Sequence, residues 1–366
     1  MKKFLSFFLT FILVFTGGLL LVSCKNQTPS LELSSNVQNL VILIGDGMGK
    51  NHIENAKIKY DIDSLDFEAD FKSKVDTNSK TLTSPTDSAA AATALATGTS
   101  VKNKVVSKDG SKNLETILEY ASKQGMKTGV VTTDNLSGAT PACFSSHAKN
   151  RGDSLDILLG QLESNVDLFI GQTNEQYQSH ASDFRSKGYN VVENFTDLKE
   201  TSKDEKVVAL LDNIKSIYNE DLENQTDFSE IVNFATSHLE NENGFVLMVE
   251  CAHIDKFSHS KNLLPALAEV HTLFDVANNL YAFDKAHNGN TAIIITADHE
   301  TGGLVKANSK ANLDASGNAL YKRSGHTDSN VNLYVHNVKF NDNAKIVKNT
   351  FVYTISKFVI DNRKTA

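Results

Sequence analysis

Residues 40–49 read LVILIGDGMG, a short apolar run that ends in a glycine-rich turn carrying Asp46. Two later runs have the same form: FVLMVE ends at Glu250, and AIIITADHE carries Asp298 and His299. Continuous apolar runs of this length are typical of parallel strands that are buried on both faces. In an open α/β sheet, the carboxyl ends of such strands build the site. The three runs therefore predict an α/β fold with polar residues gathered at one edge of its sheet.

Strand and helix patterns alternate along the rest of the chain. The expected buried strands are residues 40–44, 128–132, 168–170, 207–211, 245–249 and 291–296, and residues 331–336 alternate enough for an edge strand. Helical patterns occupy residues 87–97, 113–124, 154–164, 227–241 and 263–286. This alternation predicts a doubly wound, mostly parallel central sheet with helices on both faces. Since no repeat or clear linker interrupts it, we expect a single domain over residues 39–366.

The first 23 residues have the pattern of a targeting segment. Two lysines precede an apolar run, and the sequence Leu-Val-Ser-Cys that ends at Cys24 resembles a bacterial lipobox. We expect residues 1–23 to be a lipoprotein signal peptide and residues 24–38 to be a polar tether. Acylated Cys24 would anchor the chain to a bacterial membrane, facing the periplasm or the cell exterior. An ordinary secretory signal or an uncleaved anchor helix is the alternative.

Composition narrows the range of functions. The formal net charge is -8 and no basic stripe is present, so nucleic-acid binding is not expected. Apart from Cys24, the cysteines are Cys143 and Cys251, without a CxxC pair. Neither a disulfide framework nor cysteine-ligated zinc is therefore indicated, and both thiols are expected in the core.

Ser88 stands at the head of an alanine-rich helical segment, SPTDSAAAATALATG over residues 84–98. The N-terminus of a helix presents free backbone N–H groups and the positive end of the helix dipole, and both favour a phosphate. No Gly-x-Ser-x-Gly elbow surrounds Ser88, so a hydrolase triad is not indicated. A metal on the hydroxyl oxygen would activate it instead. A plain helix cap is the structural alternative.

Asp46 could be read as part of a dinucleotide-binding turn. The spacing is G-x-G-x-G, however, and the acid between the first two glycines would repel phosphate, so a metal ligand fits better. Asp255 and His259 are four residues apart and would share one face of a helix. A carboxylate with an imidazole suits zinc, whereas Glu250 could bind a harder ion such as Mg²⁺. A solvated acidic loop is the alternative.

Asp298 and His299 are adjacent in sequence. Adjacent residues can share one metal only where the strand bends, and the following ETGG would provide that bend. An exposed polar turn is the alternative, and His326 alone is a weak signal. Several strand ends that deliver such ligands beside one serine suggest a two-metal centre for phosphoryl transfer.

The blocks DGMG, TDSAAAATALATG, ATP followed by Arg151, VE with IDK and a histidine, and ADHETGG together resemble the alkaline phosphatase family, from about residue 39 to residue 336. The resemblance implies that Ser88 becomes a phosphoserine and that Arg151 clamps phosphate oxygens. Lys256 would approach phosphate through water, as in some bacterial members. The implied metal ligands are Asp255, His259 and His326 for a first zinc, Asp46, Asp298 and His299 for a second zinc, and Asp46, Thr140 and Glu250 for magnesium.

The activity that the resemblance implies is hydrolysis of phosphomonoesters over a broad substrate range, with two Zn²⁺ and one Mg²⁺. A related metal-dependent phosphodiesterase or sulfatase is one alternative. The sulfatase motif C-x-P-x-R is absent, and diesterases usually carry threonine as nucleophile and lack the arginine clamp. A surface lipoprotein that binds metal or phosphate without turnover is the other alternative, although every expected zinc ligand is present.

Two features depart from the family pattern. Gly138 stands two residues before Thr140, where the family commonly has Asp or His near magnesium, so the magnesium site loses outer support. The stretches 151–250 and 299–326 are short, which leaves little room for the large crown-like insertions that often help animal and enteric enzymes to dimerise. The sequence leaves a homodimer open.

Overall fold

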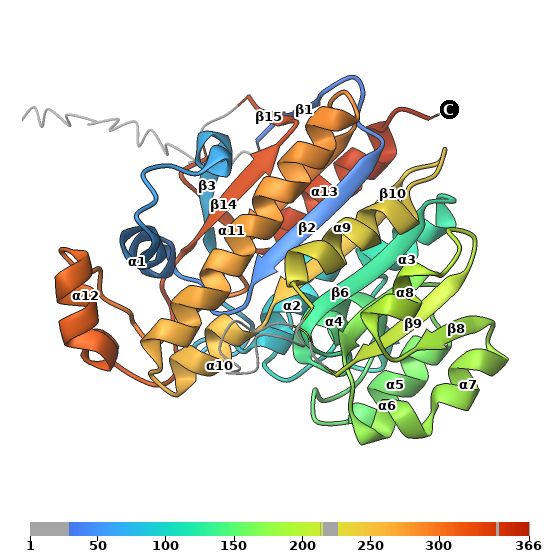
Figure 1. Ribbon diagram of the computed structural model, residues 1–366, viewed down its shortest axis with the longest axis horizontal. Helices are drawn as coiled ribbons and strands as arrows, with labels where there is room; N and C mark the ends of the chain where they lie inside the picture. The colour runs from blue at the N-terminus through green and yellow to red at the C-terminus, as the bar shows by residue number, and fades with distance from the viewer. Residues whose placement is uncertain (1–28, 213, 215–225, 342–343, 366) are drawn as a thin grey trace, which may run out of the picture.

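The computed structural model describes residues 29–212, 214, 226–341 and 344–365. The expected signal peptide and the expected lipid anchor at Cys24 lie outside these residues. Among the residues that are described, no helix has both the length and the apolar character needed to cross a membrane. A central sheet runs through the molecule and helices pack on both of its faces (Figure 1).

Ten strands of the described chain form the central sheet, and seven of the nine neighbouring pairs are parallel. In spatial order the strands are β16 (Ile346–Lys348), β3 (Phe71–Asp76), β14 (Val331–His336), β11 (Thr291–Thr296), β2 (Asn39–Gly45), β10 (Phe245–Cys251), β6 (Lys127–Asn135), β7 (Leu168–Gln172), β9 (Lys206–Leu211) and β8 (Tyr189–Val192). Every residue of β2, β10 and β11 is buried. The predicted fold class, a doubly wound and mostly parallel sheet, is confirmed.

The place of β14 in the sheet differs from the sequence prediction. Residues 331–336 do form a strand, but it lies inside the sheet, antiparallel to both β11 and β3. Its alternating pattern has another cause, since Asn332 and His336 are only partly buried while the other four residues are buried. An alternating pattern indicates that one face of a strand is less buried than the other. It does not indicate whether both backbone edges are hydrogen-bonded to neighbouring strands.

Helices cover the two faces in separate groups. α1 (Lys50–Tyr60), α9 (Phe228–Leu239) and α11 (Leu263–Ala286) pack together on one face, in front of the sheet in Figure 1. α2 (Ser88–Thr97), α3 (Ile117–Lys123), α4 (Ala139–Ser145) and α13 (Thr350–Asn362) pack on the other. The other helices within the described ranges are η1 (Asp66–Asp70), α5 (Ser154–Leu162), α6 (Glu175–Ser179), α7 (Ala181–Ser186), α8 (Phe195–Lys199), α10 (His253–His259), α12 (Lys310–Ser316) and η3 (Gly317–Leu320).

The helix expected over residues 113–124 is shorter in the structure. It starts at Ile117, because Thr116 caps it by accepting a hydrogen bond from the backbone N–H of Glu119. The residues before it belong to a small hairpin of β4 (Lys108–Asp109) and β5 (Lys112–Asn113). Thr116 and Glu119 form a capping pair that marks the start of the helix in the sequence. This pair is a stronger indication than the apolar pattern that predicts the longer helix.

The described part of the expected tether contacts the domain. β1 (Leu31–Leu33) pairs antiparallel with β15 (Val338–Phe340), and Val37 is fully buried in the core. The ordered domain therefore begins before residue 39, within the segment that we assigned to the tether.

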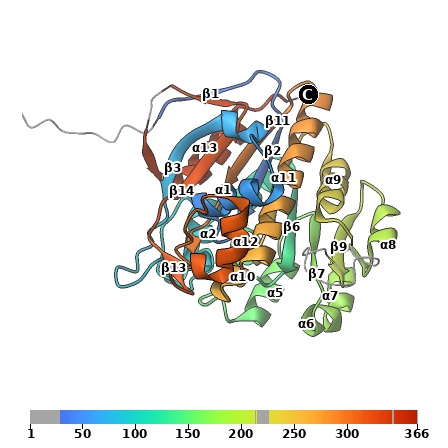
Figure 2. The same cartoon turned by 60° about the vertical axis from the view of Figure 1, so that its left-hand side comes forward.

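Strand direction places the functional segments at one edge of the sheet. β2, β10, β6 and β11 are neighbours and run parallel, so their carboxyl ends lie together. α2 and α10 lie beyond the carboxyl end of β2 in both views (Figures 1 and 2). His326 also reaches this edge from far along the chain, because its strand β13 (His326–Thr327) pairs with β12 (Glu300–Thr301).

Candidate metal centre

The structure brings Asp46, Asp298 and His299 together in one buried group. Asp46 follows β2, and the other two residues follow the neighbouring strand β11. One donor atom from each lies within 4.8 Å of the others. His299 Nε2 is 3.2 Å from Asp298 Oδ2 and 3.6 Å from Asp46 Oδ1. These are the three residues predicted for the second zinc.

A second group adjoins the first. Donor atoms of Asp255, His299 and His326 also lie within 4.8 Å of one another. His259 completes this group, since its Nε2 is 3.3 Å from Asp255 Oδ2 and 3.1 Å from His326 Nε2. Asp255 and His259 share one face of α10, as their spacing predicted. The imidazole of His299 lies within reach of both groups and stacks on that of His326, with ring centroids 3.6 Å apart.

Ser88 lies beside these groups. It is the first residue of α2, it is almost fully buried, and its Oγ lies 3.2 Å from His299 Nε2. The preceding Asp87 caps the helix by accepting a hydrogen bond from Ala90 N–H. The cap holds the start of the helix in place, and so fixes the position of the serine hydroxyl next to the predicted zinc donors.

Asp87 has a second task that sequence reasoning missed. Besides capping α2, its carboxylate accepts hydrogen bonds from Lys104 N–H and, at 3.4 Å, from Nη1 of Arg151. Burial alone would lower the pKa of Arg151, but the carboxylates of Asp87 and Asp46 raise it above its usual value. The arginine is therefore held charged beside the serine. The contact joins residues 64 positions apart, so no local pattern reveals it.

The residues predicted for magnesium come from three adjoining elements. Glu250 lies near the end of β10, beside β2, and accepts a hydrogen bond from the Thr132 hydroxyl. Thr140 is in the first turn of α4, it is fully buried, and its hydroxyl lies close enough to the Glu250 carboxylate to favour the charged form of that carboxylate. The charge of Glu250 acts on Asp46, so the two carboxylates lie close enough to repel. Lys256, on α10, forms an ion pair of 2.6 Å with Asp134.

The electrostatics of the centre fit divalent cations. Burial raises the pKa of Glu250 to about 8 and that of Asp298 to about 6. It also raises the pKa of Asp46 well above its usual value, and neighbouring carboxylates add to this effect. Asp46 Oδ1 and Asp298 Oδ2 are buried and accept no hydrogen bond from any described residue. Buried carboxylate oxygens without hydrogen bonds are costly, and metal ions would remove that cost.

Thr301 supports both groups and was also missed. Its hydroxyl donates a hydrogen bond to Asp255 Oδ1, and the same oxygen lies 3.2 Å from His299 Nδ1. A ligating histidine usually donates its second ring N–H to a nearby acceptor, and Thr301 is placed to receive it. From the sequence alone, residues 300–303 are expected only as a bend. Gly47 fits against this threonine, because a Cβ there would lie 2.8 Å from Thr301 Oγ1.

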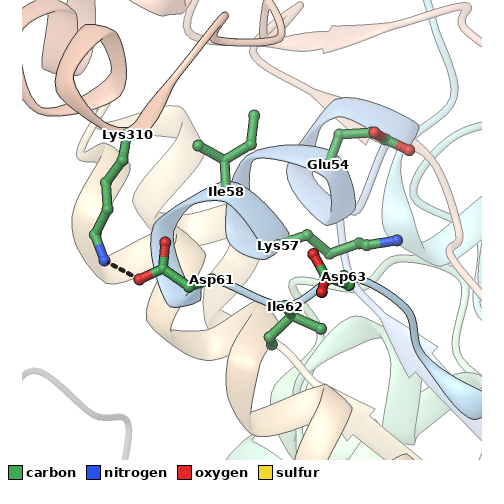
Figure 3. Close-up of a pocket in the computed structure, with 7 residues that line it drawn as sticks. All are labelled: Glu54, Lys57, Ile58, Asp61, Ile62, Asp63 and Lys310. Atoms are coloured by element: carbon green, nitrogen blue, oxygen red, sulfur yellow. Dashed lines mark hydrogen bonds and ion pairs between the residues drawn. The ribbon is translucent and has the colours of Figure 1, made fainter.

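A separate groove of about 450 Å³ lies between α1 and α12. Figure 3 shows Lys310 reaching Asp61 across it, at 2.5 Å. Lys57, on the same wall, forms an ion pair with Glu68 at 2.7 Å. The residues that line this groove include none of the predicted site residues.

Comparisons with known proteins agree with the fold and show the family. The family model described as alkaline phosphatase matches residues 37–168 and 171–351. Alkaline phosphatase 4 of Bacillus subtilis is 28% identical over 330 residues, which span 82% of this chain and 71% of that protein. The alkaline phosphatase of Schizosaccharomyces pombe is 30% identical over 304 residues, which span 72% of this chain and 56% of the yeast protein.

Solved structures show the same fold. The alkaline phosphatase of the Antarctic bacterium TAB5 superimposes with a TM-score of 0.79 at 24% identity, over 90% of this chain and 99% of that one. A variant of that enzyme with histidine replaced by aspartate, which has Mg bound in the M3 site, gives 0.78 at 25% identity. Since the family match spans most of the described residues, the chain belongs to the alkaline phosphatase family.

Proposed function

We propose that the chain hydrolyses phosphomonoesters through a phosphoserine at Ser88. The observation that carries the proposal is the position of Ser88 Oγ, 3.2 Å from His299 Nε2 and at the first residue of α2. There the hydroxyl lies beside the predicted zinc donors, and the helix end favours a phosphate. Membership of the family supports metal-dependent hydrolysis of phosphoesters.

Two zinc ions and one magnesium ion fit the donors of this centre. When bound, the ions would supply positive charge that lowers the pKa of a serine hydroxyl and stabilises the charge on a departing oxygen. The relative with Mg in its M3 site supports a magnesium ion here. The proposed ligands are Asp255, His259 and His326 for one zinc, Asp46, Asp298 and His299 for the other, and Asp46, Thr140 and Glu250 for magnesium.

The chemistry follows from the positions of the chain's own residues. Ser88 Oγ loses its proton and attacks phosphorus while the bond from phosphorus to the leaving oxygen breaks. Water then cleaves the phosphoserine, which restores the hydroxyl and releases inorganic phosphate. Arg151 can donate two parallel N–H bonds to phosphate oxygens, and Lys256 can reach them through water. The clamp takes two phosphate oxygens, and a monoester, unlike a diester, has a third that the metal ions could hold. Monoesters therefore fit better than diesters, and the leaving group contributes little to recognition.

Ser88→Ala tests the proposal. We expect the variant to bind zinc as the wild type does, to form no phosphoprotein and to lose nearly all turnover of nitrophenyl phosphate. Acid quenching after incubation with ³²P-labelled phosphate measures the phosphoprotein. Ser229→Ala, which changes a serine in the first turn of α9, is the matched control and should keep full activity. Unchanged turnover in Ser88→Ala would rule out Ser88 as the nucleophile.

The choice of substrate separates the proposal from its closest alternative. We expect the wild-type protein to hydrolyse nitrophenyl phosphate much faster than bis-nitrophenyl phosphate. The opposite preference would assign the chain to the related phosphodiesterases. No turnover of either ester by zinc-loaded protein would leave a metal-binding lipoprotein as the better reading.

We also propose that Cys24 is acylated and anchors the chain to a bacterial membrane. The motif that ends at Cys24 supports this, and two or more acyl chains give stable anchoring. Cells fed an alkyne-tagged fatty acid should yield labelled wild-type protein in the membrane fraction. Cys24→Ser should lose the label and leave that fraction, and labelling of Cys24→Ser would contradict the anchor.

A further inference from the structure

Position 138 has no side chain, yet the space beside it is filled. Gly138 is the N-cap of α4, next to the segment that carries Thr140. A Cβ at this glycine would lie 3.1 Å from Asp134 Oδ2 and 3.1 Å from the backbone oxygen of Asn135. The carboxylate of Asp134 therefore occupies the space into which a side chain at position 138 would project.

Asp134 is connected to the magnesium ligands through β6. Its backbone N–H donates to the Thr132 hydroxyl at 3.0 Å, and that hydroxyl donates to Glu250. Burial is the main reason that the pKa of Glu250 is raised, and the charge of Asp134 raises it further. A short path of hydrogen bonds thus joins the Asp134 backbone to a predicted ligand, and its carboxylate lies close enough to act on that ligand.

The two oxygens of Asp134 have different surroundings. Oδ1 accepts Asn135 Nδ2 at 3.1 Å and forms the 2.6 Å ion pair with Lys256. Oδ2 lies toward position 138, and the side chain as a whole is 14% exposed. One oxygen fixes the lysine, and the other faces the space that a side chain at position 138 would occupy.

We propose that Asp134 is a positioning residue that takes over the task of the side chain missing at position 138. Magnesium loses its hydration reluctantly and usually keeps several waters. Oδ2 of Asp134 would accept hydrogen bonds from those waters, while Oδ1 holds Lys256 toward the substrate phosphate. This inference rests on the magnesium site of the proposed function.

Moving the carboxylate from position 134 to position 138 tests the inference. Magnesium binding to zinc-loaded protein is measured by titration calorimetry for Asp134→Ala, Gly138→Asp and the double variant. We expect Asp134→Ala to bind magnesium about 10- to 100-fold more weakly, as is usual when an outer partner of a metal is lost. Gly138→Asp alone should also bind it more weakly, because two carboxylates would crowd one space. The double variant should return to within about threefold of the wild-type affinity, as an outer partner is restored.

Two controls separate a local effect from a general one. Asp76→Ala removes a comparably buried carboxylate, which forms an ion pair with Lys348. Asp76 lies in β3, far from β6 in the strand order, so this variant should leave magnesium affinity unchanged. Asp134→Asn keeps the shape of the side chain but not its charge, and should weaken magnesium binding as the alanine variant does. Zinc content, measured by mass spectrometry, should stay at the wild-type value in every variant.

The results distinguish the two proposals. Wild-type affinity in Asp134→Ala, or loss of zinc in parallel with magnesium, would overturn the role of Asp134 and leave the proposed function standing. Failure of the double variant to regain affinity would also overturn it. If zinc-loaded wild-type protein forms phosphoserine but binds no magnesium, the third metal of the proposed function is excluded. The proposed role of Asp134 is then excluded as well.

Discussion

At the scale of single residues, the proposed phosphate clamp depends on a neighbouring carboxylate. The Asp87 carboxylate both caps α2 and holds Arg151, so one side chain sets the positions of the proposed nucleophile and the proposed clamp together. Asparagine is an equally good helix cap but carries no charge. The two tasks of Asp87 can therefore be separated by a single substitution.

We expect Asp87→Asn to raise the inhibition constant of inorganic phosphate about tenfold, because a charge-assisted hydrogen bond to the arginine contributes about 1.5 kcal/mol. Stability should fall by less than about 1 kcal/mol, since the cap remains. Competitive inhibition of nitrophenyl phosphate turnover measures the constant. Asp153→Asn is the control, because Asp153 precedes α5 without making a side-chain cap bond. An unchanged constant in Asp87→Asn would show that Arg151 does not depend on this contact.

How far the sequence predicts the site differs among its residues. Each predicted zinc ligand lies at a strand end, in a helical pair or in a family block, and the structure brings all six together. Asp87 and Thr301 also lie in family blocks, and Asp134 lies near the end of β6, but these positions do not show which residues they contact. Their partners become neighbours only when the sheet has formed, so a linear pattern could not reveal them.

At the scale of elements, a partly buried ion network fixes the end of β14. His336 bonds Asp70 of η1 at 2.6 Å and Asp284 of α11 at 3.0 Å, and Tyr281 donates to Asp70 at 2.7 Å. Lys72 adds a weaker ion pair with Asp70 at 3.8 Å. Burial alone would lower the pKa of His336, but the hydrogen bonds to both carboxylates raise it to about 9. The charged imidazole thus ties one strand to helices from two other parts of the chain.

This network predicts a loss of stability in alkaline solution. The folded pKa of His336 is about 9 and the ordinary value is 6.5, so the proton is held more tightly in the folded state. The stabilisation, about 2 kcal/mol after allowance for partial exposure, is complete below pH 6.5 and is lost as the pH rises through 9. Urea unfolding of wild type and His336→Gln should differ by this amount at pH 6 and converge near pH 10.

Tyr281→Phe serves as the control for the pH effect, because it removes one hydrogen bond to Asp70 but leaves the ion pairs. It should lower stability by a similar amount at pH 6 and at pH 9. If the free energy of unfolding differs between wild type and His336→Gln by a constant amount across this pH range, the His336 imidazole does not titrate near pH 9 in the folded protein.

The elements themselves show which signals can be read from sequence. The helix over 263–286 and the strand over 291–296 have the predicted bounds, because long periodic or wholly apolar runs leave few other choices. Residues 331–336 were predicted as a strand but placed at the wrong position, since strand order depends on partners far along the chain. Residues 31–33 were missed because three residues that pair only with β15 are too few to form a pattern.

At the scale of the whole molecule, the metal centre concentrates negative charge in the interior. Asp46, Glu250 and Asp298 come from neighbouring strands and are buried, and one oxygen each of Asp46 and Asp298 accepts no hydrogen bond from a described residue. A fold of this kind is stabilised by ions that bind only when the strand ends are assembled. The stability of the domain and the binding of ions at its site are therefore thermodynamically linked.

We expect excess EDTA to lower the unfolding temperature by about 10 °C, from about 4 kcal/mol of linked binding energy, and zinc to restore it. Scanning fluorimetry measures the shift. Ser88→Ala should show the same shift, because it removes no proposed zinc ligand. An identical unfolding temperature with and without chelator would show that the centre does not hold ions in the folded protein.

The order of strands in the sheet has a consequence for biosynthesis. Asn39, at the start of β2, pairs with Thr291, and the other neighbour of β2 is β10. While the ribosome is still producing the first two thirds of the polypeptide, the middle of the sheet lacks both of its flanking strands. Closing loops of this length is entropically costly and slow, so a nascent chain stays open until late in synthesis. If the N-terminal segment directs export, a translocation channel would receive a chain that has not yet been able to fold.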